Sequence, residues 1–140
     1  MAPSALKNLT QGIIEVLKAD GVLSAEVKEW AFGEPTQETN FPIVWVQLMR
    51  GRSTWKSGNA LQEAMWYEII VKVRDTDRDS AETKVMDLFD RVKRVQKDDP
   101  TWGDRFRTSR LDTFSAAPSR SGDYAVARIS SNLMVEREYA

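Results

Sequence analysis

The sequence predicts an α+β fold: a single domain, residues 1–140, with a largely antiparallel four-stranded sheet and two helices packed on one face of it. Apolar and polar residues alternate in the stretch MWYEIIVKV, residues 65–73, which is the pattern of a strand. An apolar stripe with helical spacing follows over residues 81–95. Two more strand-like stretches come after it, so the expected order is helix, strand, strand, helix, strand, strand.

The first expected element is a helix that begins near Ser4, its N-cap, and ends at Asp20 and Gly21. Residues 22–40 are expected to be irregular, with a turn-rich loop that projects Trp30. The apolar stripe of the helix consists of Leu6, Leu9, Ile13, Val16 and Leu17.

The first two strands are expected on either side of a long polar loop. The stretch FPIVWVQLM, residues 41–49, is β-branched and aromatic, which favours a strand. Residues 50–64 are rich in Gly, Ser and basic side chains and are expected to form the loop. In the strand at residues 65–73, Met65, Tyr67, Ile69, Val71 and Val73 share one face, and Trp66, Glu68, Ile70 and Lys72 share the other.

The second helix is expected from about Ser80 to Val95, followed by a break at Pro100 and Gly103. Its apolar stripe consists of Ala81, Val85, Leu88, Phe89, Val92 and Val95, and its wet face offers the i, i+4 ion pairs Asp87/Arg91 and Asp90/Arg94. The last two strands are expected at residues 105–116 and 124–138, joined by the stretch APSRSGD. One face of the last strand consists of Ala125, Ala127, Ile129, Ser131, Leu133 and Val135.

The composition excludes several classes of chemistry. The chain has no cysteine and no histidine, which removes disulfides, Cys/His zinc sites, thiol nucleophiles and imidazole acid–base catalysis. Its 20 basic and 21 acidic residues give a net charge of −1, so no global charge favours nucleic acid or an anionic membrane as the main partner. The start of the chain lacks the pattern of a signal peptide, and we expect synthesis in the cytoplasm.

Three aspartates, Asp75, Asp77 and Asp79, raise the question of a metal site because their i, i+2, i+4 spacing matches the first ligands of a Ca²⁺ loop. Such a loop also needs Gly at its sixth position and Glu at its twelfth, where this chain has Ser80 and Met86. We therefore interpret the stretch as a polar joint in which Asp79 or Ser80 caps the second helix, and we expect no metal or other cofactor. A metal-dependent phosphoesterase is the enzymatic alternative.

Basic residues near the second helix offer a nucleic-acid-binding module as an alternative of another class. They are interrupted by acidic neighbours, and no aromatic-interleaved RNA motif accompanies them, so solvated faces are the preferred interpretation. The residues concerned are Lys93, Arg94, Lys97, Arg105, Arg107 and Arg110.

Two groups of residues are expected to contact other proteins. Arg50, Arg52, Trp55 and Lys56 combine an aromatic side chain with cations on the predicted loop, which is typical of a partner contact; the alternative is a loop folded back with Trp55 as its plug. Trp66 and Ile70 make the second face of the central strand too apolar for open water, which predicts a subunit interface that includes Trp30. No catalytic constellation is present in the sequence, and we expect that the protein is not an enzyme.

The layout resembles that of the small tail-terminator or tail-completion proteins of long-tailed phages. The stretches that carry the resemblance are the opening helix, FPIVWVQL, the polar stretch RGRSTWKSGNALQEA, MWYEIIVKVRDTDRDSAETKVMDLFDRV and the closing pair of strands. The resemblance covers most of residues 4–138. It consists of the same order of elements, with a similar pattern of hydrophobicity and similar lengths.

The resemblance implies a virion structural protein at the junction of tail and head. Such proteins are ring-forming subunits, usually hexameric, that cap the head-proximal end of the tail tube, stop its polymerisation and join it to the neck. The implied partners are further copies of the chain, the tail tube protein and a neck or connector protein, with DNA passing through the lumen without specific binding and no membrane involved. A head-completion or connector-adaptor subunit of the neck is the alternative within this class.

Overall fold

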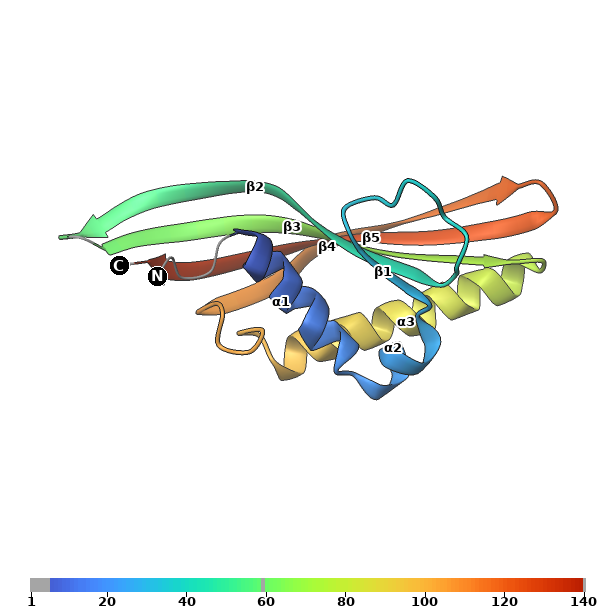
Figure 1. Ribbon diagram of the computed structural model, residues 1–140, viewed down its shortest axis with the longest axis horizontal. Helices are drawn as coiled ribbons and strands as arrows, with labels where there is room; N and C mark the ends of the chain where they lie inside the picture. Colours follow the sequence, from blue (N-terminus) through green and yellow to red (C-terminus); the bar gives the residue numbers. More distant parts are fainter. Residues whose placement is uncertain (1–5, 59, 140) are drawn as a thin grey trace.

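The computed structural model describes residues 6–58 and 60–139, and its helices lie along one face of a long twisted sheet (Figure 1). The α+β class is confirmed, but the sheet has five strands in the order β1-β2-β3-β5-β4, and β1 runs parallel to β2. The elements in chain order are α1 (Leu6–Lys18), α2 (Gly21–Glu26), β1 (Glu29–Phe32), β2 (Ile43–Ser57), β3 (Ala60–Asp75), α3 (Arg78–Asp98), β4 (Thr108–Ser121) and β5 (Tyr124–Tyr139). The predicted Ser4 cap lies outside the described residues.

Two long hairpins form the sheet. β2 and β3 pair antiparallel from Ile43/Lys72 to Ser57/Ala60, and β4 and β5 pair antiparallel up to Ser121/Tyr124. β3 and β5 join the hairpins at the centre of the sheet. The turns of the two hairpins lie at opposite ends of the molecule, and the helices cover the region between them (Figure 1).

The main core lies between the sheet and the helices. The predicted alternation is confirmed in both central strands, because the side chains assigned to one face of β3 and one face of β5 are all buried. The apolar stripe of α3 is buried as predicted, with Val95 only partly buried. Full burial of each large aliphatic side chain is worth about 1.5–3 kcal/mol, so this face fixes the arrangement of the helices.

Residues 21–32 are more regular than predicted, since they contain α2 and β1. α2 has six residues and β1 has four, and neither is long enough to show a clear period in the sequence. The predictions of four strands and two helices are wrong for this reason. β1 pairs with residues 43–46 of β2, so the first residues of β2 are inside the sheet and not at its edge.

The prediction of a loop at residues 50–64 is wrong. These residues continue β2 and β3 as a hairpin that turns at Gly58, whose φ of 56° suits glycine. Likewise, the stretch APSRSGD was expected to connect two strands, but its residues 117–121 belong to β4 and the turn lies at Gly122. The first stretch is polar because it extends past the helices, where neither face needs a continuous apolar side.

A second, smaller core lies on the helix-free face of the sheet. Ile43, Trp45 and Ile70 are buried there, and Phe41 and Ala31 pack against them. The segment between β1 and β2 arches over this face (Figure 1). Its Glu38 carboxylate accepts a hydrogen bond of 2.5 Å from Lys72 Nζ, which fixes the segment to the sheet.

The turn between α3 and β4 folds inward and closes one end of the main core. Trp102 is fully buried with a φ of 52° and donates a hydrogen bond of 3.0 Å from Nε1 to Ser109 Oγ. Ser109 Oγ donates in turn to the Pro100 carbonyl at 2.6 Å, and Gln96 Nε2 donates to the Ser109 carbonyl at 3.0 Å. Ser109 thus connects the turn, α3 and β4.

The connection between α1 and α2 is tied to α3 by one carboxylate. Asp20 caps α2 by accepting from Leu23 N at 3.0 Å, and it also accepts from Arg91 Nη2 at 2.5 Å. The hydrogen bond from Arg91 holds the pKa of Asp20 below its ordinary value. The predicted Asp87/Arg91 pair is wrong, because Arg91 turns towards Asp20.

We expect Ser109→Ala to lower the free energy of unfolding by about 1–3 kcal/mol, because it leaves the buried indole N–H of Trp102 without an acceptor. Urea denaturation followed by circular dichroism measures the change. Ser115→Ala, at an exposed position on the same strand, is the control and should change stability little. Equal effects of the two substitutions would contradict this role of Ser109.

We expect Asp20→Asn to lower stability at neutral pH by up to about 1 kcal/mol, since Asn keeps the cap but loses the charge that pairs with Arg91. Because the folded-state pKa of Asp20 is depressed, this stabilisation is complete above the ordinary value of 3.8 and disappears as the pH falls through the folded pKa. Stability curves of both proteins from pH 7 to acid should therefore converge at low pH. Asp87→Asn, at an exposed position on α3, should show no such convergence.

Candidate functional site

The β2–β3 hairpin forms an arm, defined here as residues 49–66, which extends past the helices at one end of the sheet (Figure 1). Among the described residues, β1 pairs only with residues 43–46 of β2. The outer backbone edge of β2 is therefore unpaired along the arm. Unpaired strand edges are templates for pairing with another chain.

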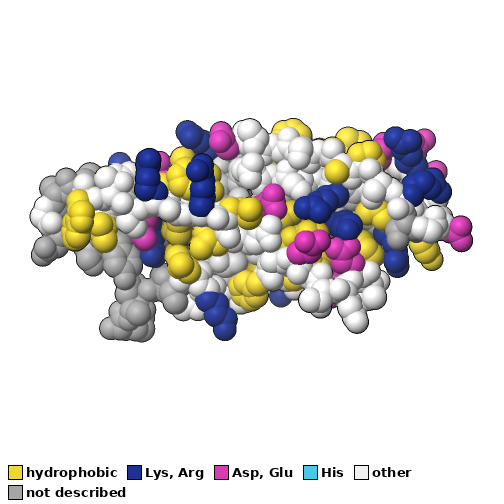
Figure 2. Space-filling view, turned by 90° about the horizontal axis from the view of Figure 1, so that it is seen from above, with side chains coloured by type: hydrophobic (Ala, Val, Ile, Leu, Met, Phe, Trp, Pro, Cys, Tyr) yellow, Lys and Arg dark blue, Asp and Glu magenta, His cyan; other side chains and the backbone are white. Residues whose placement is uncertain are grey.

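The arm carries the residues of the predicted partner contact on two different faces. The Arg50 guanidinium lies 4.3 Å from the ring centroid of Trp66, so these two residues share the helix-free face. Arg52 lies on the same face, at a shallow cavity of about 190 Å³ that Thr54 and Glu136 also line. Figure 2 shows basic, acidic and hydrophobic side chains interspersed on this face.

Trp55 points to the other side of the arm. It pairs with Leu61, which lies on the same face of β3 as the core residue Met65, and 68% of its surface is exposed. The alternative in which Trp55 plugs a loop folded back over the domain is therefore wrong. Lys56 belongs to β2, but its side chain lies outside the described residues.

The residues of the predicted subunit interface have different environments. Ile70 is completely buried inside the chain under Phe41, so its predicted exposure at an interface is wrong. Trp66 is partly exposed beneath Arg50, and Trp30 is partly buried against the main core. The roles of Trp66 and Trp30 in a subunit contact stay predictions.

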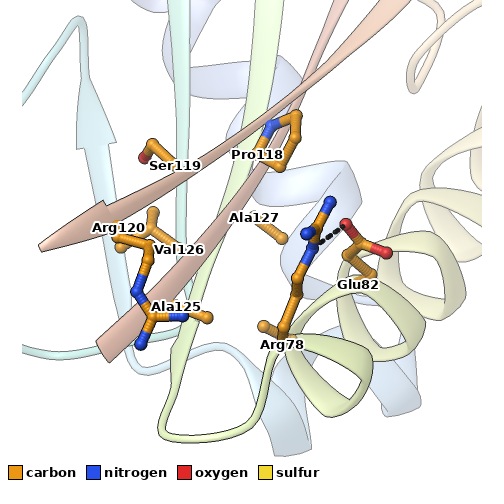
Figure 3. A pocket seen from close by; sticks show the side chains of 9 residues that line it. Arg78, Glu82, Pro118, Ser119, Arg120, Ala125, Val126 and Ala127 are labelled. Carbon is orange, nitrogen blue, oxygen red and sulfur yellow. Dashed lines mark hydrogen bonds and ion pairs between the residues drawn. The ribbon is translucent and has the colours of Figure 1, made fainter. Parts of the chain in front are cut away.

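A groove runs between α3 and the β4–β5 hairpin, at the end of the molecule opposite to the arm. Two adjoining cavities of about 210 and 220 Å³ form it. Figure 3 shows its rim, where Arg78 and Glu82 form an ion pair at 3.3 Å. The residues common to both cavities are Glu82, Pro118 and Ala127, and the others include Ala81, Val85, Met86, Ala116, Ala117, Ser119 and Arg120.

The wall of this groove is the last strand of the sheet. β4 has no further strand beyond it in the described sheet, and Pro118 lies on it, a residue that sheets accept at edges. Two large apolar side chains beside the groove, Phe114 and Met86, are more than half exposed. The ring centroids of Phe114 and of Phe89 on α3 are 5.1 Å apart. This groove was not predicted from the sequence, although the small residues at 116–118 were a signal for it.

The aspartate stretch is a helix start. Asp77, and not Asp79 or Ser80 as predicted, is the N-cap of α3, and it accepts from Ser80 N at 3.1 Å and Ser80 Oγ at 2.8 Å. The hydrogen bonds from Ser80 lower the pKa of Asp77. Asp75 accepts from Asp77 N at 3.1 Å. In residues 6–58 and 60–139, no three acidic side chains are grouped so that they could hold a metal ion.

The basic residues of the nucleic-acid alternative do not share one surface. Arg105 lies across α1, where it forms an ion pair with Glu15 at 3.5 Å and donates to the Trp102 carbonyl at 3.0 Å. A Cβ at Gly12 would lie 1.9 Å from Arg105 Nε, so any larger residue there would displace the Arg105 side chain. Lys93 instead lies near the ring of Phe114, at 5.6 Å from its centroid.

Comparisons with known proteins are sparse. No family model matches the chain, and a search of curated proteins gave no match. Among solved structures, a chain described as "Virion of native gene transfer agent (GTA) particle" is similar, with 14% identity, a TM-score of 0.46, and coverage of 91% of this chain and 94% of that one. At this identity and TM-score the likeness supports no functional conclusion. Of the described helices, none combines the length and apolar character needed to cross a bilayer.

We expect Trp55→Ala to change the free energy of unfolding by no more than about 0.5 kcal/mol, as is usual for exposed positions. Trp45→Ala removes a buried side chain of the second core and should cost about 3–5 kcal/mol. Thermal and urea denaturation of both variants test this contrast. A large loss of stability for Trp55→Ala would mean that this side chain serves folding and not contact.

Proposed function

We propose that this protein is a virion structural protein, a tail terminator that forms a ring at the head-proximal end of a tail tube. It acts through contacts between proteins and not through catalysis. The observation that carries the proposal is that, in the described sheet, the outer edge of β2 along the arm and the outer edge of β4 have no partner strand. Both edges are accompanied by exposed apolar side chains, which supports their use in assembly.

Two different edges favour a ring over a two-fold dimer. When one surface of a subunit binds a different surface of the next subunit, the contact is head-to-tail, and repetition gives a closed ring or an open filament. A ring in which one axial face fits the end of the tube and the other does not accept another tube ring would stop polymerisation. Its other axial face would meet the neck.

The charge of the chain agrees with a lumen through which DNA passes without specific binding. Basic and acidic residues are balanced at 20 and 21, and the cations of the nucleic-acid alternative are dispersed over several elements. A lumen that carries both signs of charge does not retain the DNA backbone strongly. The proposal needs no cofactor.

We expect the purified protein to form rings that negative-stain electron microscopy detects. The rings should all have one size, and six subunits is the number that the resemblance implies. Added to polymerising tail tube protein, it should bind one end of each tube and shorten the mean tube length. The tube protein alone is the control. Absence of rings and of any effect on tube length would contradict the proposal, and rings that bind only the neck protein would favour the head-completion or connector-adaptor alternative.

A further inference from the structure

We infer that the groove between α3 and β4 receives the arm of a second copy of this chain, with Trp55 as the anchoring side chain. The inference rests on the proposed ring and names the contact that would build it. The occupant is a second copy because the arm and the groove complement each other in strand direction, in the face of the sheet that they use, and in size.

Strand direction is the first argument. The pairs β2/β3, β3/β5 and β5/β4 are all antiparallel, so β2 and β4 of one molecule run in opposite directions. A second copy placed beside the first in the same orientation brings its β2 next to β4 as an antiparallel pair. The two sheets then continue into each other with their helices on the same side. An edge strand that adds to another sheet in this way is a recurrent mode of recognition.

The face of the sheet is the second argument. Trp55 lies on the helix side of the arm, because its partner Leu61 shares the face of Met65. The groove also lies on the helix side, because Ala116 pairs with Ile129 of the main core. In an antiparallel pair, residues opposite each other project to the same side. Pairing of the two edges therefore directs Trp55 towards the groove and not away from it.

Size and polarity are the third argument. The two adjoining cavities are walled mainly by alanine, proline and valine side chains, and their volumes of about 210 and 220 Å³ leave room for a bulky aromatic group. An indole presents a large apolar body and one N–H donor. Glu82 at the rim carries carboxylate oxygen atoms that can accept from that donor.

The position of β1 adds a constraint on how the copies lie. β1 occupies the edge of β2 at residues 43–46, so in the described sheet β2 is free to pair beyond residue 46. In one molecule, residue 117 of β4 lies in the same cross-strand row as residue 43 of β2, through Arg128 and Lys72. Bringing Trp55 to the groove therefore requires the second copy to shift along the strands. Closed barrels have such a stagger, with strands tilted to the barrel axis.

Introduced cysteines test the contact without background, since the chain has none. Thr54→Cys lies on the arm and Ser119→Cys on β4, both on the helix-free face. We expect a short bismaleimide to join a mixture of the two single variants into dimers. The double variant should give a ladder of covalent oligomers that ends at the ring size. Ser24→Cys on α2 combined with Ser119→Cys is the control pair and should give no ladder.

Two results would overturn the contact. Cross-linking of Thr54→Cys alone, as strong as that of the mixture, would show that arms meet arms in a two-fold contact. Absence of cross-links in the mixture, under conditions where the wild-type protein assembles, would show that the arm and β4 do not meet.

Sedimentation analysis separates this inference from the proposed function. Trp55→Ala and the groove-filling Ala116→Gln should each weaken self-association about thirtyfold, as truncation or blocking of a central anchor does. Ser115→Gln, the matched control on the opposite face of β4, should leave it unchanged. Assembly that tolerates both test variants overturns the arm contact and leaves the ring proposal standing. A wild-type protein that is monomeric at every accessible concentration overturns both.

Discussion

The burial of one face of β3 is the constraint on which the rest of the structure depends. Met65, Tyr67, Ile69, Val71 and Val73 all point into the layer between sheet and helices. β3 has β2 on one side over residues 60–72 and β5 on the other over residues 61–75. A shift by one residue would turn this whole row to the other face. The register of β3 therefore determines where α1 and α3 pack and which side of the arm Trp55 occupies.

The helix-free face is organised by charges that lie over aromatic rings. The Arg74 guanidinium lies 4.6 Å from the ring centroids of both Phe41 and Tyr124. It thus connects the segment that covers the second core with the turn of the β4–β5 hairpin. Arg128 lies 5.5 Å from the Trp45 ring in the same core. A cation over an aromatic ring contributes about 0.5–1 kcal/mol at an exposed site and about 2 kcal/mol at a desolvated one, so this thin core is supported from its rim.

Long elements with a repeating apolar face were predicted from the sequence. Short elements, and surfaces formed by segments far apart in the chain, were missed. The faces of β3, β5 and α3 were predicted correctly because each buries one side over many residues. α2 and β1 were missed because six and four residues show no clear period. The arm was predicted as a loop because neither of its faces contributes a long apolar row.

The candidate site was predicted only in part, for related reasons. Trp55 and Arg52 were singled out as partner contacts because an aromatic residue among cations is visible in one stretch of sequence. Both are exposed, and their contact with a partner stays a prediction. Ile70 was misassigned because its cover, Phe41, comes from a segment whose path has no local signal. Asp77, Asp79 and Ser80 are all near the start of α3, and each can cap a helix. Only the backbone geometry selects Asp77. The groove joins α3 to β4, which no local pattern relates.

The close approach of Arg105 to Gly12 has a consequence for the evolution of the family around this chain. The two positions are far apart in the sequence, yet a single methyl group at position 12 would occupy the place of the guanidinium stem. A larger residue at position 12 therefore requires the Arg105 side chain to take another path or to be replaced by a shorter one. In related sequences we expect the two positions to covary, with a larger residue at 12 accompanied by a shorter one at 105. Covariation of positions 12 and 105 would identify the opening helix and the turn between α3 and β4 in related sequences, even where the rest of the sequence has diverged.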